Sequence, residues 1–153
     1  MNIMDFYEEQ KIDTKWLLIA GAVLLLPPVI LALTVKGGIS ISILITLPIA
    51  ILLFLLKLKT QINKDGITMQ FIPIIITPKK INWEEIQTAV IRNYKPIWEY
   101  GGWGLRVSFK HGIAYTVKGK TGLQLTLKNG KQILIGTQKP DELQSAINKH
   151  LKP

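Results

Sequence analysis

The chain has 153 residues, 19 Lys or Arg against 10 Asp or Glu, and a formal net charge of +9. This length allows a membrane hairpin and one small soluble domain. The absence of cysteine excludes a disulfide framework, a thiolate zinc site and a cysteine nucleophile. Two histidines, His111 and His150, are too few for a histidine-rich metal site.

The charge is unevenly divided along the chain. The net charge is −1 up to Leu56 and +10 from Lys57 onward. A basic domain tethered at a bilayer favours anionic lipid headgroups as its nearest partner. The alternative is a solvated, lysine-rich face that keeps the domain soluble. No recognition helix or RNA-binding signature is present, so we expect no nucleic-acid partner.

Residues 1–15 form a short segment of mixed character. If this segment is helical, Ile3, Phe6 and Tyr7 share one face. Such a face would lie in the headgroup region of a membrane. We therefore predict an N-terminal interfacial segment over 1–15.

Two apolar segments follow, at 16–35 and 39–58, each 20 residues long and uncharged until Lys57. About 20 apolar residues of helix cross the hydrocarbon core of a bilayer. The pattern predicts a transmembrane helical hairpin over 16–58. Lysines flank the two outer ends more than the connecting loop, which places both termini and the soluble domain on the cytoplasmic side of the inner or plasma membrane.

From residue 60 the hydrophobic pattern changes to alternation, which is typical of strands. Asp65-Gly66 and Asn129-Gly130 are hairpin turn signals, and His111-Gly112 marks a further turn. Pro140 and the acids after it predict the start of a helix. Its apolar stripe consists of Leu143, Ala146, Ile147, His150 and Leu151.

About seven short antiparallel strands followed by one amphipathic helix give an α+β domain over 60–153. A C-terminal helix that caps a strand barrel or sandwich is the layout of a PH-like (pleckstrin-homology-like) domain. The chain also resembles the bacterial PH-like domain family of small two-span membrane proteins. The matching features are Ile62-x-x-Asp65-Gly66-Ile67, Ile81-x-Trp83-Glu84-Glu85-Ile86, the stretch Gly122 to Gly136, and the final helix.

The stretch Trp98 to Arg106 combines three aromatic residues, three glycines, a carboxylate and an arginine. One interpretation is a binding loop or interfacial foot in which Trp98, Tyr100 and Trp103 contact headgroups or a partner. The other is a tight inter-strand loop whose aromatics close one end of the domain and whose Glu99 pairs with Arg106. Loops on rigid scaffolds often carry function, and we keep both interpretations.

A second candidate contact is Lys79-Lys80, which follows a proline and suits diffuse contact with lipid. In PH domains that bind phosphoinositides, basic residues lie in the first hairpin loop. Here that loop, 63–66, has one lysine beside an acid, which argues against such recognition. We find no catalytic set and expect no cofactor or metal, since Glu84 and Glu85 diverge on a helical turn.

These patterns predict a membrane-anchored, non-enzymatic binding or scaffolding module at the cytoplasmic membrane face. Its partners would be anionic membrane lipids or an unknown membrane or cytoplasmic protein. The alternative is an accessory or immunity-type membrane protein that acts through its transmembrane hairpin. Gly21 and Ala22 would permit close helix contact in that case.

Overall fold

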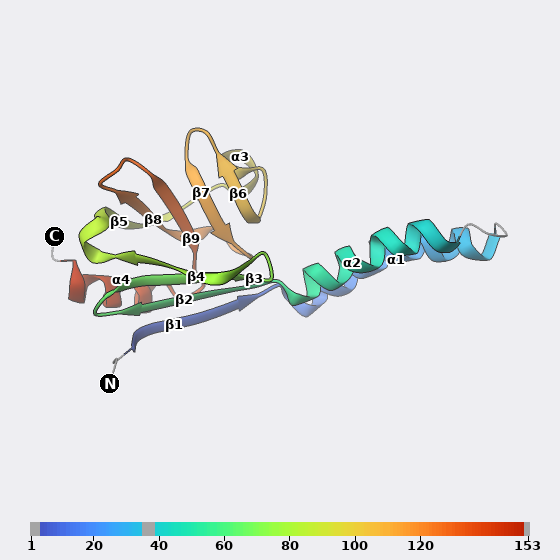
Figure 1. The fold of residues 1–153 in the computed structure, drawn as a ribbon, viewed down its shortest axis with the longest axis horizontal. Coiled ribbons are helices and arrows are strands. Elements are labelled where there is room, and N and C mark those ends of the chain that lie inside the picture. Colours follow the sequence, from blue (N-terminus) through green and yellow to red (C-terminus); the bar gives the residue numbers. More distant parts are fainter. Residues whose placement is uncertain (1–3, 35–38, 152–153) are drawn as a thin grey trace. The chain divides into compact units, whose positions relative to one another are not determined.

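The structure is a computed structural model, and it describes residues 4–34 and 39–151. The chain divides into two compact units. The sheet unit consists of Met1–Lys11 and Lys57–Pro153, and the helical unit consists of Ile12–Leu56. Nine strands in two sheets and a few helices make this a mixed α+β protein (Figure 1).

The helical unit contains helix α1 (Thr14–Thr34) and helix α2 (Ile39–Leu55). By length and composition, α1 can cross a membrane, since its window Thr14–Leu31 has a mean hydropathy of 1.9. Little of that window is buried, which differs from the core helix of a soluble protein. Helix α2 is also apolar, but it is shorter than a full span over its described residues.

The predicted second span, 39–58, is wrong at its C-terminal end. Helix α2 ends at Leu55, and Lys57 and Leu58 lie in a strand. Leu58 is fully buried in the sheet unit rather than available to lipid. Alternation of polar and apolar residues begins at Lys57, so a strand there buries Leu58 on one face. The predicted connecting loop at 36–38 lies outside the described residues.

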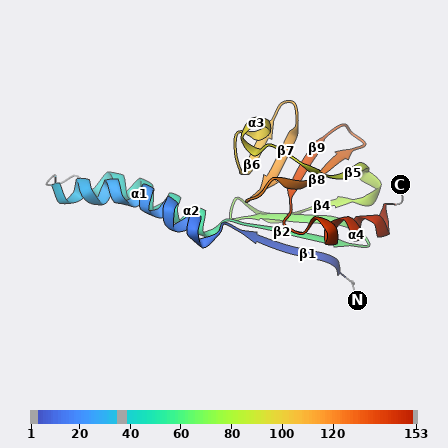
Figure 2. The same cartoon turned by 180° about the vertical axis from the view of Figure 1, so that it is seen from behind.

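The first sheet has four antiparallel strands in the order β1-β2-β3-β4 (Figure 2). Their bounds are β1 (Met4–Lys11), β2 (Lys57–Asn63), β3 (Gly66–Ile72) and β4 (Ile75–Asn82). The prediction of an interfacial helical face over 1–15 is therefore wrong for Phe6 and Tyr7. On a strand these neighbours point to opposite faces, and Phe6 is buried while Tyr7 is exposed. Ile3, the third residue of that face, lies outside the described residues.

The pairing of β1 with β2 makes the sheet unit discontinuous in sequence. Lys11, the last residue of β1, is the register partner of Lys57, the first residue of β2. The whole helical unit is thus an insertion between two neighbouring strands. An antiparallel pair is usually joined by a short turn, and here the connection is two helices.

The second sheet has five strands in the order β5-β8-β9-β7-β6. The strands are β5 (Ile86–Asn93), β6 (Gly104–Ser108), β7 (Gly112–Thr116), β8 (Thr121–Leu127) and β9 (Gln132–Gly136). The part of the chain predicted to hold about seven strands contains eight, β2 to β9, and the ninth strand of the described residues, β1, lies outside that part. The purely antiparallel prediction is also wrong, because β7 and β9 pair in parallel. The β8–β9 hairpin places β9 between β8 and β7, where β9 runs in the same direction as β7.

Two of the turns predicted from the sequence are confirmed, and each contains a glycine. Gly66 pairs with Asn63 across the β2–β3 turn, and Gly112 pairs with Ser108 across the β6–β7 turn. A Cβ at Gly112 would lie 2.1 Å from the carbonyl oxygen of Gln132, and the φ of Gly112 is +76°. Both the left-handed backbone and the close approach of β9 therefore require glycine there.

Three short helices complete the sheet unit. The helical turn expected at Glu84 and Glu85 is the 3-10 turn η1 (Trp83–Glu85), and Glu85 accepts hydrogen bonds from the backbone and side-chain amides of Asn82. Helix α3 (Pro96–Tyr100) lies in the stretch predicted as a loop. Helix α4 (Pro140–His150) is confirmed, and its stripe residues Leu143, Ala146 and Ile147 are buried.

The two sheets enclose an aliphatic core, to which Phe71 of β3 and Tyr115 of β7 contribute an edge-on ring contact at 6.4 Å. Helix α4 lies against β1 and β5. His150 at its end is partly buried, and its ring stacks on Trp83 at 4.9 Å. Its Nε2 lies 2.9 Å from Asp5 Oδ2. Hydrogen bonds from His150 and Lys149 lower the pKa of Asp5.

Strand β1 is fixed to the second sheet by buried polar contacts. The buried carboxylate of Glu8 accepts hydrogen bonds from Thr137 Oγ1 and from the backbone N–H of Gln138, each at 2.7 Å. Gln10 Nε2 donates to the carbonyl oxygen of Gly136 at 2.6 Å. These contacts join the N-terminal strand to the connection between β9 and α4.

We predict that Glu8→Ala destabilises the sheet unit by about 1.5–3 kcal/mol, because it removes charge-assisted hydrogen bonds and leaves a backbone N–H unpaired. The measurement is urea unfolding of the full chain in detergent, followed by tryptophan fluorescence. Glu84→Ala, at an exposed position, is the control and should change stability by no more than about 0.5 kcal/mol. Equal, small effects of the two changes would contradict the integration of β1.

Candidate binding surface

Helix α3 gives the stretch 94–104 a fixed shape. Pro96 occupies its first turn, where a missing N–H is harmless. Gly101 ends the helix in the left-handed conformation, with φ +72°, and its N–H bonds to the carbonyl oxygen of Ile97. This glycine-terminated single turn is a common way to end a helix. The stretch is thus a structured protrusion rather than an open loop.

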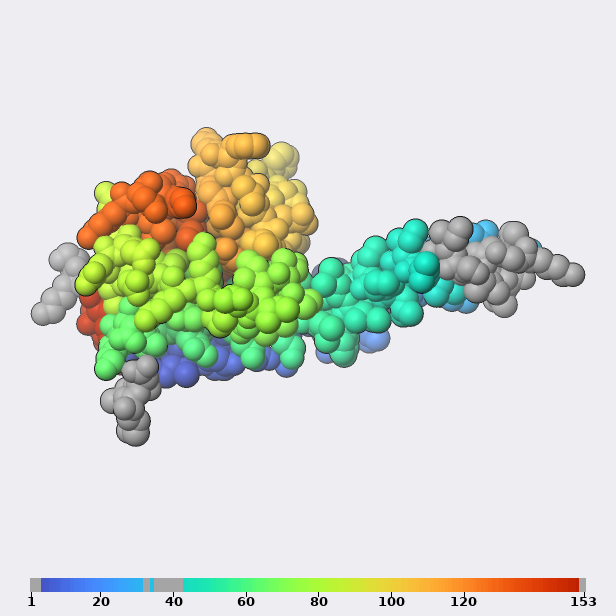
Figure 3. All heavy atoms as spheres, in the orientation of Figure 1, coloured from blue at the N-terminus to red at the C-terminus, as the bar shows by residue number. Residues whose placement is uncertain are grey.

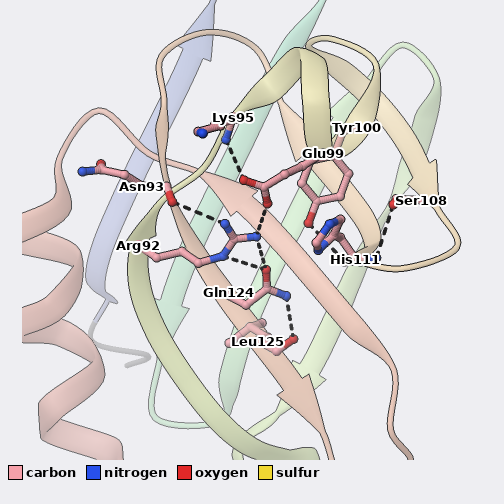
Figure 4. Close-up of polar contacts among 9 residues, drawn as sticks. All are labelled: Arg92, Asn93, Lys95, Glu99, Tyr100, Ser108, His111, Gln124 and Leu125. Carbon is pink, nitrogen blue, oxygen red and sulfur yellow. Dashed lines mark hydrogen bonds and ion pairs between the residues drawn. The ribbon is translucent and has the colours of Figure 1, made fainter.

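An ion pair between Arg92 of β5 and Glu99 holds α3 on the sheet (Figure 4). Arg92 Nη2 lies 2.7 Å from Glu99 Oε2, and the other carboxylate oxygen accepts the backbone N–H of Lys95 at 2.7 Å. The hydrogen bond from Arg92 lowers the pKa of Glu99, and the reciprocal bond raises the pKa of Arg92. Both side chains are less than one-third exposed, so the pair is partly shielded from solvent.

Arg92 also donates to Gln124 Oε1 of β8, from Nε at 3.2 Å and from Nη2 at 3.0 Å. The predicted pair between Glu99 and Arg106 is therefore wrong. Arg106 donates from Nε to the carbonyl oxygen of Trp103 instead. Its strand, β6, is at the far edge of the sheet, whereas Glu99 is oriented toward β5 and β8 (Figure 4). The sequence signal for Arg92 was only a lone charge within an apolar strand.

The three aromatic residues of the stretch have different surroundings. Tyr100 is buried, and its hydroxyl donates to the carbonyl oxygen of His111 at 3.0 Å. It packs edge-on against Tyr94 at 6.2 Å, in a small cluster with Ala114 and Leu134. Burial raises the pKa of Tyr100 and raises that of Tyr94 to about 12. Tyr100 therefore anchors α3 to the sheet and does not present its ring to a partner.

Trp103 has an intermediate position. Its side chain is 41% exposed, and its Nε1 donates to the carbonyl oxygen of Gly119 at 2.8 Å. That bond reaches the connection between β7 and β8. Trp103 thus makes a structural contact and is still partly accessible to solvent.

Trp98 points away from this network and is 87% exposed. Its neighbour Ile97 is 64% exposed, and Phe109, in the β6–β7 turn, is fully exposed. The bond from Tyr100 to His111 holds α3 against that turn, and the two lie side by side in Figures 1 and 2. We call Ile97, Trp98 and Phe109 the aromatic tip.

Two of the three tip residues were not singled out from the sequence. Strand β6 ends at Ser108, which places Phe109 in the turn that follows. The available sequence signal for Phe109 was its position as a large apolar residue directly before the polar residues Lys110 and His111. Lys95, Arg106 and Lys110 are also exposed and near these residues in sequence.

The other predicted contact residues, Lys79 and Lys80, lie on β4 of the first sheet and are exposed. Lys79 Nζ is 5.9 Å from the centre of the Tyr115 ring, and Lys80 Nζ is 3.7 Å from Asp65 Oδ2. They lie on the first sheet, whereas Arg106 lies on β6 of the second sheet.

The polar groups in and around the stretch that contains Glu99 bond to one another. Glu99 bonds to Arg92, Arg106 to Trp103, and His111 accepts from Tyr100 through its backbone. In the parts of the chain that the structure describes, no group of three or more His, Asp or Glu residues could hold a metal ion.

Searches of family models, curated proteins and solved structures find no match to this chain.

We predict that Glu99→Gln destabilises the sheet unit by about 1–2 kcal/mol at pH 7, because the charge of the partly shielded pair is lost. The folded-state pKa of Glu99 lies below its unfolded value. Its contribution is therefore present above the unfolded pKa, about 4.3, and is lost as the pH falls through the folded pKa. Urea unfolding at pH 7 and at lower pH measures the difference from wild type. A difference independent of pH would contradict this assignment.

Proposed function

We propose that this protein is a membrane-anchored, non-enzymatic binding module that docks a partner protein on its aromatic tip. The helical unit supplies the anchor, and the sheet unit is the scaffold on which the tip is held. Two sheets and a C-terminal helix support a PH-like architecture for this scaffold. Its additional strands and the parallel β7–β9 pair would be departures from a simple PH-like sandwich.

The β1–β2 pairing supports a two-span anchor. Residues 11 and 57 are partners in one sheet, so they lie on the same side of any membrane. If α1 crosses the bilayer, the chain must therefore return within residues 35–56. Helix α2 is the apolar segment available for that return. The pairing thus favours an even number of crossings, and a helix pair lying on the surface is the alternative.

The length of α2 is compatible with a crossing. Its 17 described residues give about 25 Å at 1.5 Å per residue, compared with a hydrocarbon core of about 30 Å. A shortfall of a few ångströms is accommodated by local thinning of the bilayer at modest cost. The lysines at the outer ends of the helices favour a cytoplasmic location for the sheet unit.

The exposed rings of Trp98 and Phe109 are the observation that carries the binding role. Exposed aromatic side chains on a rigid protrusion are typical of interaction sites, and Trp is enriched among residues that dominate binding energy. The side chains of Arg92, Glu99 and Tyr100 are engaged in internal bonds that hold α3 in place. A rigid tip loses little conformational entropy on binding.

The tip best fits a protein partner with an apolar pocket and an acidic rim. Lys95, Arg106 and Lys110 supply exposed positive charge near the tip in sequence. The charge would speed association and orient the partner, while the rings would supply the buried contact. A lipid surface is the other occupant to test. It would contact the same rings and positive charges, but without a fixed stoichiometry.

We predict that Trp98→Ala and Phe109→Ser each abolish capture of a partner in native membranes without unfolding the protein, because both side chains are exposed. The measurement uses a photo-crosslinking residue at position 97 and counts discrete adducts of fixed mass. Met4→Ala, which removes an exposed apolar side chain from the first sheet, is the matched control. Adducts that persist in both tip variants, or that vanish equally in the control, would overturn the assignment.

We also predict that protease added to right-side-out vesicles spares tags at both chain ends, whereas inverted vesicles lose both tags. The reason is that β1 and β2 belong to one sheet, so both ends share a side. Immunoblotting of the two tags measures this. Tags on opposite sides would contradict the pairing, and tags both cleaved from outside would reverse the orientation.

A further inference from the structure

Three elements of the first sheet meet at the edge from which the chain leaves for the helical unit. Lys11 ends β1, Lys57 begins β2, and Ile72 ends β3, and Lys57 is the register partner of both others. The turn that joins β3 to β4 follows Ile72 directly. We call this end of the sheet, with the β3–β4 turn and the first two residues of β4, Ile75 and Ile76, the exit edge. It lies at the right-hand end of the first sheet in Figure 3.

The exit edge exposes aliphatic side chains where a soluble domain would normally have polar ones. Ile74 is 49% exposed and Ile76 is 74% exposed. Turns between strands are usually built from Gly, Asn, Asp, Ser and Pro. Both isoleucines are held in place, since Ile75 pairs with Phe71 and the Gln70 amide donates to the carbonyl oxygen of Ile76. The apolar surface is therefore a fixed feature of the turn and of the start of β4.

Few residues of the chain separate this edge from the apolar helices. Only Ile12 and Asp13 separate Lys11 from α1, and only Leu56 separates α2 from Lys57. A residue spans at most about 3.6 Å, so these linkers reach no further than about 11 Å. If the helices enter a bilayer, the exit edge must lie near its surface.

The charges at the exit edge suit an anionic surface. Lys11 is the last residue of β1, and Lys57 and Lys59 are among the first residues of β2. The acid nearest to them is Glu9, which pairs with Lys11 at 3.0 Å and with Lys59 at 3.7 Å. The net charge of these four side chains is positive. At the opposite edge of the sheet, the β2–β3 turn carries Lys64 and Asp65, whose charges cancel.

We propose that Ile74 and Ile76 insert into the headgroup region of an anionic bilayer, with Lys11, Lys57 and Lys59 at the phosphate level. Aliphatic side chains beside lysines are the combination that membrane interfaces accept, because the apolar atoms enter the lipid while the ammonium groups reach phosphate. This contact fixes the sheet unit against the membrane by a third point besides its two chain connections. It rests on the membrane anchor proposed above.

The experiment uses the absence of cysteine in the chain. Ile74→Cys, Ile76→Cys and the control Lys64→Cys are each made in the full protein and labelled with an environment-sensitive fluorophore. The proteins are reconstituted into vesicles of phosphatidylcholine and phosphatidylglycerol, with and without lipids that carry a quencher just below the headgroup. We expect severalfold stronger quenching at positions 74 and 76 than at position 64.

Flotation of the same vesicles separates the possible failures. If the protein does not float with the vesicles, the membrane anchor fails and the inference about the turn fails with it. If it floats, but positions 74 and 76 are quenched no more than position 64, the turn inference alone is overturned. A fourth label, from Phe109→Cys, tests the tip: quenching there would overturn protein docking and leave the turn inference standing.

Discussion

The pairing of β1 with β2 is the constraint on which the rest of this protein depends. It joins the two parts of the sheet unit, Met1–Lys11 and Lys57–Pro153, which the helical unit separates in the sequence. It also requires that any membrane crossing be followed by a return. The same register that joins Lys11 to Lys57 sets the β3–β4 turn beside both connections.

Buried and half-buried polar contacts hold the remaining pieces in place. Glu8 fixes β1 to the connection after β9, and Arg92 fixes α3 to β5 and β8 through Glu99 and Gln124. Because these groups bond to one another, the side chains left toward solvent on α3 are apolar. These polar groups are thus used in internal bonds, and the exposed aromatic and aliphatic side chains form surfaces that suit binding to a protein or a bilayer.

Local sequence was informative wherever one residue type decides the backbone. Asp65-Gly66 and Asn129-Gly130 predicted hairpins that the structure contains, and the stripe of α4 predicted its buried face. Long-range pairing was not accessible in this way. Nothing in Met4–Lys11 identifies β2 as its partner across the helical insertion, and a short alternating segment can be read with a helical or a strand period. The parallel β7–β9 pair and the partner of Glu99 depend on the same kind of distant contact.

By itself, the sequence determined a basic domain of strands and one amphipathic helix, preceded by two apolar segments, because composition and periodicity act locally. It also located the stretch around Trp98 as unusual. Only the tertiary structure decided that Tyr100 lies inside and Trp98 outside, that Phe109 joins them, and that Arg92 holds Glu99. These outcomes depend on which strands become neighbours, and the order β5-β8-β9-β7-β6 is set by contacts between residues far apart in the chain.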